Sequence, residues 1–377
     1  MSLILAKPQT VYRFDYKTRE QLEELLLQQH EATELVEISR PSELLFAENG
    51  LSQGRLDWTS QGLSQLCSLL ATGFAQTVQC IAGPAMYGRT VEQNSGYDPK
   101  LALAVINAVL RSRFAKLDGY QLLLVGNTVV GLVGRRYALV SNHDFYSRMV
   151  EFGESINCLR LVDAQLAGRR LALRIAETEA AFAIKLQANV SEHKFYGGIY
   201  GSNSETGDCS VRISTMLIRA DNKACAIQPF ARGSKVTHVR GKRFNQKLVK
   251  LLEETFVKLS DIAEYRVLMA SMPGMNLGLG NAADSHTRQI AKLKRALKKT
   301  GISVSSVSAI CDRLLLYGSS AVDAAATNIS PLDLFATRSA YDLYNAITHI
   351  AKNLTIDSRE RVEQVAFEFL CSPNLLL

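Results

Sequence analysis

Arg170-Leu171-Ala172-Leu173-Arg174-Ile175 alternates arginine or alanine with aliphatic residues, and this period of two decides the fold. Successive side chains of a strand point to opposite faces, so one face carries guanidinium groups and the other carries aliphatic groups. The same alternation returns in four later segments: Ala181 to Leu186, Tyr196 to Gly201, Cys209 to Ile218 and Lys223 to Gln228. Short turns separate these segments, which predicts an antiparallel sheet within residues 158–228.

Helical patterns flank the expected sheet on both sides. Before it we expect helices at Lys17 to His30, from Ser60 to Leu70, from Pro99 to Leu110 and at His143 to Phe152, with a hairpin at Gln121 to Val133. After it we expect helices at Phe244 to Met269, Asn281 to Lys299, Ser303 to Tyr317, Pro331 to Lys352 and Ser358 to Cys371. This order predicts an α+β fold in three parts: a mixed N-terminal α/β region (1–155), an antiparallel sheet with a basic loop (156–242) and a C-terminal helical region (243–377).

The composition is typical of a packed globular protein, because 47% of the residues are hydrophobic and 21% are charged. The apolar run from Leu3 to Ala6 is too short for the core of a signal peptide. The longest apolar stretch, Leu122 to Val133, is interrupted by Gly126 and Asn127 and is too short to span a membrane. The seven cysteines contain no CxxC pair. We therefore expect a soluble, cytoplasmic protein with reduced, buried thiols, no metal site and no cofactor.

Positive charge is concentrated between Arg232 and Lys299, a stretch that contains 15 Lys or Arg and only 5 Asp or Glu. The net charge of this stretch, +10, exceeds the +7 of the whole chain, and such a regional excess indicates binding to phosphates. The helix expected at its end has Ile290, Leu293 and Leu297 on one face. A row of cations about 16 Å long lies on the opposite face: Arg288, Lys292, Arg295 and Lys299. The alternative is an ordinary solvated helix face, although the helix has no acidic partners after Asp284.

A second basic cluster lies in the loop before the helical region: Arg232, Lys235, His238, Arg240, Lys242 and Arg243. Aromatic residues precede and follow it: Tyr196, Tyr200, Phe230 and Phe244. Cations interleaved with aromatic rings favour single-stranded nucleic acid, because its backbone follows the charge and its bases stack on the rings. The alternative is that these rings belong to the core.

No established catalytic motif fits the chain. The phosphate-loop, dinucleotide-binding and nucleophile-elbow patterns are absent, and the six histidines are scattered. Glu205 and Asp208 form the one dense acidic pair near the basic stretch. A magnesium-dependent nuclease that uses this pair therefore stays an alternative.

The polar segment Gly201 to Gly207, followed by Val211-Arg212-Ile213, Arg219, Cys225 and His238, resembles a phage- and plasmid-borne family known as domain of unknown function 932. The family-like turn consists of Asn203, Ser204, Glu205 and Gly207. Gly134 to Val140 is similar to the family's strand before a short helix, and Tyr341 to Thr348 is similar to its C-terminal helix. Where relatives often have Cys-Thr-Asn-Gly, this chain has Cys225-Ala226-Ile227-Gln228. The resemblance covers about residues 120 to 370, and it implies a mobile-element setting in a bacterial host cell without implying an activity.

These features predict a non-enzymatic nucleic-acid-binding protein of a phage or plasmid, with single-stranded DNA as the favoured partner and homo-oligomers as the binding form. Such a protein acts in replication, recombination or protection of the element's DNA. Besides the nuclease, a second alternative is a virion component or host-defence inhibitor whose basic region docks an acidic protein. RNA stays an alternative to DNA as the bound nucleic acid.

Overall fold

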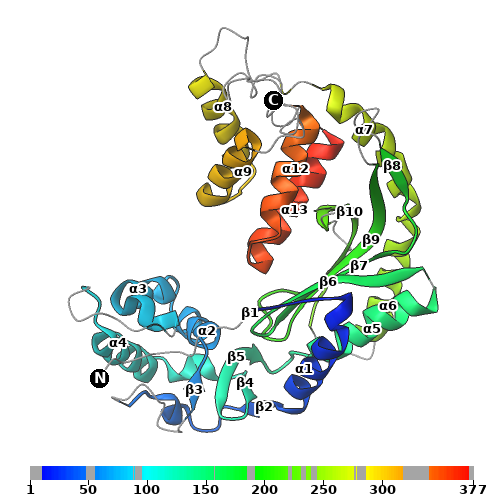
Figure 1. The fold of residues 1–377 in the computed structure, drawn as a ribbon. Coiled ribbons are helices and arrows are strands. Elements are labelled where there is room, and N and C mark those ends of the chain that lie inside the picture. The colour runs from blue at the N-terminus through cyan, green and yellow to red at the C-terminus, as the bar shows by residue number, and fades with distance from the viewer. Residues whose placement is uncertain are drawn as a thin grey trace.

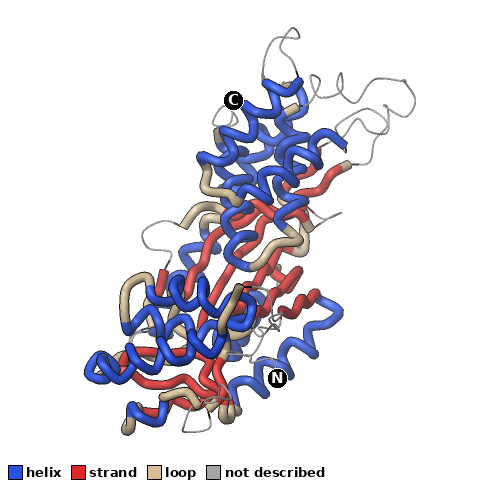
Figure 2. Tube along the Cα trace, turned by 90° about the vertical axis from the view of Figure 1, so that its left-hand side faces the viewer, coloured by secondary structure: helices blue, strands red, loops and turns tan. Residues whose placement is uncertain are grey.

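A computed structural model of the protein describes residues 11–47, 56–87, 89, 96–156, 158–184, 192–219, 223–230, 235–238, 244–275, 277, 286–316 and 339–372. A small N-terminal lobe, a large curved sheet and a group of C-terminal helices follow one another through the molecule (Figure 1). Figures 1 and 2 agree that the N-terminal lobe and the C-terminal helices lie at opposite ends.

The larger sheet contains β1 (Val11–Asp15), β6 (Leu159–Ala167), β7 (Arg170–Glu177), β8 (Phe182–Ile184), β9 (His193–Ser204), β10 (Val211–Arg219), β11 (Ala224–Ile227) and β12 (Lys235–Val236). The smaller sheet contains β2 (Thr33–Glu37), β3 (Asp57–Trp58), β4 (Tyr120–Val125) and β5 (Thr128–Gly134). The N-terminal helices are α1 (Arg19–Glu31), α2 (Ser60–Leu70), α3 (Phe74–Ala82), α4 (Pro99–Ser112) and α5 (Asn142–Ser155). The C-terminal helices are α6 (Phe244–Val257), α7 (Tyr265–Ser271), α8 (His286–Lys299), α9 (Val304–Leu316), α12 (Ala340–Ala351) and α13 (Ile356–Cys371).

All strand pairs of the larger sheet are antiparallel, in the order β1-β6-β7-β9-β10-β11, with β8 on β9 and β12 on β10. The antiparallel sheet expected from the alternating pattern is thus confirmed, and so is the α+β class. The sheet also takes β1 from the N-terminus, with Val11 opposite Ala167 and Asp15 opposite Asp163. The expected boundary at residue 155 therefore divides a sheet that β1 and β6 build together.

The aliphatic face of the larger sheet forms the main core. Leu171, Leu173 and Ile175 of β7 are buried there. Helix α5 covers this face closely, because a Cβ placed at Gly201 of β9 would lie 2.8 Å from Phe145 Cζ and 2.9 Å from Met149 Cε. A larger residue at this position would require Phe145 or Met149 to shift.

The opposite face carries Arg170, Ala172 and Arg174, as the alternation predicts. It is buried rather than presented to solvent, since α13 packs on it beside Ala172, Ala176, Tyr200 and Met216. The guanidinium groups of this face therefore lie inside the protein, where each needs a charged or polar partner.

The N-terminal lobe has a separate core around Trp58, Leu63, Ile106 and Val129. The smaller sheet has the order β2-β4-β5-β3, and its last pair, β3 with β5, is parallel. Helix α2 lies directly on β5, because a Cβ at Gly62 would lie 2.7 Å from the carbonyl oxygen of Val129. Figure 1 shows α2, α3 and α4 together on this lobe.

The structure departs from the expected helices in three places. The helix expected from Phe244 to Met269 is two helices, α6 and α7, separated by a 3-10 turn at Ser260–Glu264. Ser260 Oγ donates a hydrogen bond to the Val257 carbonyl at 2.8 Å, and this bond competes with the helical pattern. Helix α3 has no counterpart in the expectation; left-handed glycines, Gly73 and Gly83, precede and follow it.

The segment Gly134 to Val140, compared above with a family strand, also differs. Only its first residue belongs to β5, and a turn and an extended segment follow. The expected helix at Pro331 to Lys352 is observed only as α12. Ser339 is its extended N-cap, with ψ 165°, so the helix begins at Ala340, and residues 331–338 lie outside the described part of the chain.

The seven cysteines form no disulfide, which confirms the free thiols. Four are buried, whereas Cys80 and Cys371 are exposed and Cys158 is half-buried, so the expectation of uniform burial was wrong for these three. In the described part of the chain, every helix falls short of the length and apolar character that crossing a membrane requires.

Candidate nucleic-acid interface

Helix α8 has the two faces that its sequence predicts. Leu293 and Leu297 are fully buried and Ile290 is half-buried. The helix packs on α9, where Val307 and Ile310 belong to the same core. On its other side the four cations of the expected row are all exposed: Arg288, Lys292, Arg295 and Lys299.

The charge along α8 is uncompensated within the helix. Its 14 residues include six Lys or Arg and no Asp or Glu. Among the described residues, no ion pair involves any of the four row cations. Like charges four residues apart, as in Arg288 with Lys292 and Arg295 with Lys299, destabilise a helix by about 0.2 to 0.5 kcal/mol per pair. The row therefore presents uncompensated positive charge to solvent.

The basic loop is described only in part. Arg232, Arg240, Lys242 and Arg243 lie outside the described residues. Lys235 is exposed on β12, opposite Arg212 of β10, and is available to an anion.

His238 was expected to contribute a cation, and this expectation was wrong. The ring is buried and stacks on Tyr137, with centroids 5.1 Å apart and an angle of 5° between the planes. Burial lowers the pKa of His238 to about 4, so the ring is neutral at pH 7. His238 therefore belongs to the core rather than to a phosphate site.

This burial makes the stability of the protein sensitive to acid. Unfolded histidine binds a proton below about pH 6.5, whereas His238 in the folded protein stays neutral down to a pH of about 4. The folded state thus loses stability as the pH falls from 6.5 to 4, by about 2 kcal/mol at pH 5. We expect His238→Phe, which retains the stack on Tyr137, to reduce the loss between pH 7.5 and pH 5 by about this amount in urea unfolding. An equal loss in both proteins would show that His238 titrates normally.

The four expected stacking residues differ in their burial and in their contacts. Tyr200 is fully buried, and the Arg174 guanidinium lies 5.1 Å from the centre of its ring, so its assignment as a base-stacking residue was wrong. Phe230 is half-buried and packs against Tyr200 and Arg212, with the guanidinium of Arg212 5.4 Å from its ring centre. Tyr196 is half-buried and lines a pocket. Phe244 begins α6, and its side chain is outside the described part.

The family-like turn lies between the larger sheet and the N-terminal lobe. Asn203, Ser204 and Glu205 are fully buried, whereas Gly207 is exposed with φ 75°, a left-handed value that favours glycine. Asn203 Nδ2 donates to the Val140 carbonyl at 3.0 Å and to Asn142 Oδ1 at 2.9 Å.

The same turn reaches across to α2 of the lobe. Gln61 Nε2 donates to Thr206 Oγ1 at 2.6 Å, and Gln65 Nε2 donates to Asp208 Oδ1 at 2.5 Å and to the Thr206 carbonyl at 3.0 Å. Tyr137 completes the contacts by donating its hydroxyl to the Glu205 carbonyl at 2.8 Å. These bonds make the turn a structural joint between lobe and sheet.

Both carboxylate oxygens of Glu205 have partners within this joint. One carboxylate oxygen pairs with Arg169 and the other accepts the backbone N–H of Asn142 at 2.5 Å. Burial raises the pKa of Glu205 against the opposing effect of Arg169, and it lowers the pKa of Arg169 against the opposing effect of Glu205. The carboxylate is therefore turned away from any substrate, and the nuclease alternative loses the residue on which it depended. The described residues contain no group of three or more His, Cys, Asp or Glu arranged to hold a metal ion.

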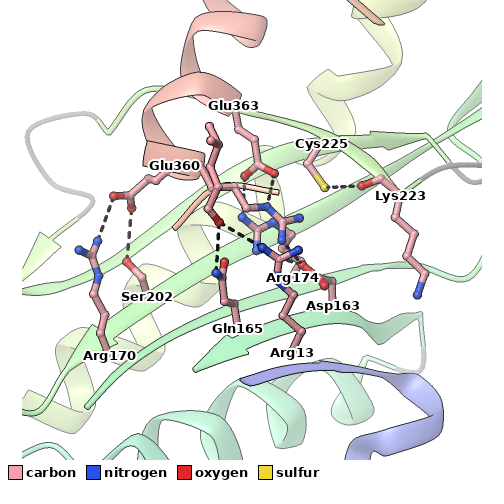
Figure 3. A network of polar contacts seen from close by, with 12 residues as sticks. Arg13, Asp163, Gln165, Arg170, Arg174, Ser202, Lys223, Cys225, Glu360 and Glu363 are labelled. Carbon is pink, nitrogen blue, oxygen red and sulfur yellow. Dashed lines mark hydrogen bonds and ion pairs between the residues drawn. The ribbon is translucent and has the colours of Figure 1, made fainter. Parts of the chain in front are cut away.

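A buried charge network joins the guanidinium face of the sheet to α13 (Figure 3). Arg174 of β7 contacts Glu363 at 2.6 Å and Asp163 at 3.2 Å, and Arg359 contacts the same two carboxylates at 2.8 Å each. These four side chains form a closed ring of alternating charge. Burial alone would lower the pKa of Arg174, but Glu363 and Asp163 more than offset it and raise that pKa above its ordinary value.

A second part of the network lies beside the ring. Glu360 accepts from Arg212 at 2.8 Å and from Arg170 at 3.2 Å, and Arg170 also pairs with Asp357. Four arginines thus meet four carboxylates, so the network is electrically neutral and offers no surplus charge to an external anion. Its role is to hold α13 on the sheet.

This network was not predicted from the sequence. The signal was present, since Arg359, Glu360 and Glu363 fall on neighbouring positions of one helix face. Charged residues are almost never fully buried without partners, however, and the partners here come from strands that lie almost 200 residues earlier in the chain.

Comparison of the chain with models of protein families, with curated proteins and with solved structures finds no match.

Proposed function

We propose that this protein binds nucleic acid through the phosphate backbone, with the cation row of α8 as the principal contact. The observation that carries the proposal is four exposed cations on one helix face, in a helix without any acidic residue. Lys235 adds a further exposed cation at the start of the basic stretch. The resemblance stated above makes a phage or plasmid the proposed setting, in replication, recombination or protection of its DNA.

Single-stranded DNA is the first partner to test. A row about 16 Å long lets several successive phosphates approach the cations without any reading of base edges. Such a site binds without marked sequence preference, and its affinity falls steeply with salt, because each neutralised phosphate on a single strand contributes about 0.7 to the slope of log K against log salt. Tyr200 is buried and cannot stack on a base, so charge is the main source of the proposed affinity.

We expect Lys292→Gln/Arg295→Gln to weaken binding uniformly across sequences and to reduce the salt slope by about 1.4, since two phosphate contacts are removed. Fluorescence anisotropy with a labelled single strand, at four salt concentrations, measures both quantities. Lys100→Gln/Arg111→Gln on α4 is the matched control, because it removes the same charge from an exposed helix in the N-terminal lobe. The control should retain the wild-type slope.

Equal slopes in the two double variants would assign the binding to overall charge and exclude the α8 row. Tighter binding to a duplex of the same sequence would change the preferred partner but leave the row in place. Absence of binding at micromolar protein and low salt would contradict the proposal and favour the alternative of an acidic protein partner. Light scattering of the free and bound protein tests whether binding involves homo-oligomers.

A further inference from the structure

A pocket of about 250 Å³ opens at the ends of β6, β7, β9 and β10. We call it the strand-end pocket. Its floor is apolar and belongs to the guanidinium face of the larger sheet: Val162, Ala176, Tyr196 and Ile218. Its described lining includes no residue of α13, so the pocket lies beyond the part of this face that the helix covers.

Cations outnumber carboxylates around this floor. Lys17, Arg160, Arg219 and Lys223 line the pocket with only Asp15 and Glu177 as acidic residues. The Arg219 guanidinium is held by α12, where it donates to Asn345 Oδ1 at 2.6 Å, and Lys223 contacts Asp15 at 3.4 Å. Lys17 and Arg160 form no ion pair with any described residue. An anion entering here therefore meets a net positive rim above an apolar floor.

Two backbone irregularities meet at this pocket. The pairing of β6 with β7 shifts register between Leu161 and Asp163, a bulge that lies at Val162 in the floor. Lys223 has φ 52° and is the one non-glycine residue with positive φ in the described part of the chain. Bulges and strained residues are typical of ligand sites, since a fold retains them where a side chain must be aimed.

We propose that the strand-end pocket binds a nucleoside 5′-phosphate, with the base on Tyr196 and the apolar floor and the phosphate on Arg160, Lys17 and Lys223. The volume is slightly below the range of about 300 to 1,000 Å³ of small-molecule sites, which suits one nucleotide rather than a strand. An aromatic ring offers a stacking surface to any base, and a guanidinium matches the geometry of a phosphate. The ligand is either a free nucleotide or the terminal nucleotide of a strand, because both present the same chemistry.

This site is independent of the α8 proposal. Figure 1 shows α8 apart from the end of β1, where Asp15 and Lys17 contribute to the pocket. The double variant Lys292→Gln/Arg295→Gln should therefore retain nucleotide binding. Failure of one proposal leaves the other standing.

Isothermal titration of the full chain with adenosine 5′-monophosphate, adenosine and inorganic phosphate tests the pocket. We expect the nucleotide to bind at least tenfold more tightly than either of its parts. Arg160→Gln should weaken the nucleotide at least tenfold, and Tyr196→Leu should weaken the nucleotide and adenosine while sparing phosphate. Arg266→Gln, an exposed arginine of α7, is the matched control and should bind as wild type does.

Lys223→Gly separates a ligand role from a structural one. Glycine accepts a positive φ without strain, so this variant should unfold at a urea concentration at least as high as the wild type. Its nucleotide affinity should nevertheless fall severalfold, because the cation is gone. A variant that is less stable and binds normally would show that Lys223 serves the turn alone.

Two results would overturn the proposal: phosphate binding as tightly as the nucleotide, or no heat of binding at millimolar nucleotide. The source of the ligand is resolved by competition in the α8 double variant. A 5′-phosphorylated oligonucleotide that displaces the nucleotide, while its unphosphorylated counterpart does not, identifies a strand end. Failure of both oligonucleotides to compete identifies a free nucleotide.

Discussion

Glu363→Ala is expected to lower the free energy of unfolding by about 3 to 5 kcal/mol. Glu363 is fully buried and holds two arginines, Arg174 at 2.6 Å and Arg359 at 2.8 Å. Removing its carboxylate leaves two guanidinium groups with only Asp163 between them, and an uncompensated buried charge is among the most destabilising changes a protein can undergo. Urea unfolding monitored by circular dichroism measures the loss.

Glu368→Ala on the same helix is the matched control. Its partner Arg361 lies 3.4 Å away in a pair that solvent reaches on both sides, and such pairs contribute about 0 to 1 kcal/mol. Equal losses in the two variants would contradict a supporting role for the ring. The full replacement Asp163→Leu/Arg174→Met/Arg359→Met/Glu363→Leu should recover most of the stability, because replacing a whole buried ion network by packed apolar residues is often neutral.

Glu205→Ala is expected to destabilise the protein by a similar amount, about 3 to 5 kcal/mol. The change leaves Arg169 buried without its carboxylate and leaves the Asn142 N–H without its acceptor. It also loosens the joint between the lobe and the sheet, so the lobe should become more susceptible to proteolysis. Glu205→Gln should lose less, because its amide oxygen still accepts from Asn142.

Asp208→Asn provides the comparison within the same turn. Asp208 is exposed and accepts from Gln65 through Oδ1 and from Thr206 through Oδ2. An asparagine retains one acceptor oxygen, so one exposed hydrogen bond is lost and a loss of about 1 kcal/mol is expected. A catalytic role for the pair predicts the reverse pattern, in which both variants are stable and inactive. A fully stable Glu205→Ala protein would restore the nuclease alternative.

Much of the fold follows from periodicity. The alternation around Arg174 identified an antiparallel sheet and the correct grouping of side chains on its two faces. Most helices were found close to their observed bounds, because apolar spacing and caps such as Asp98 before Pro99 are local signals. β1, β2, β3 and β12 were missed because strands this short take their conformation from their partners, which are β6, β4, β5 and β10.

The candidate sites were predictable to different degrees. The row on α8 needed only helical geometry, since four cations and three aliphatic residues on opposite faces follow from a period of 3.6. His238 and Tyr200 were misassigned because their surroundings come from Tyr137 and Arg174, which no local pattern places beside them. The strand-end pocket was missed because Lys17, Arg160 and Lys223 meet only when four strands and a turn come together.

The sequence by itself determined the α+β class, the two faces of the sheet and the exposed cations of α8, because each depends on residues a few positions apart. Only the tertiary structure decided that the guanidinium face is buried under α13 and neutralised, whereas the cations at the strand ends are left open around a pocket. The physical reason is that burial and ion pairing are set by segments distant in the chain. The alternation of residues 170–175 predicts which side chains share a face of the sheet. The tertiary packing decides which helix or pocket lies against that face.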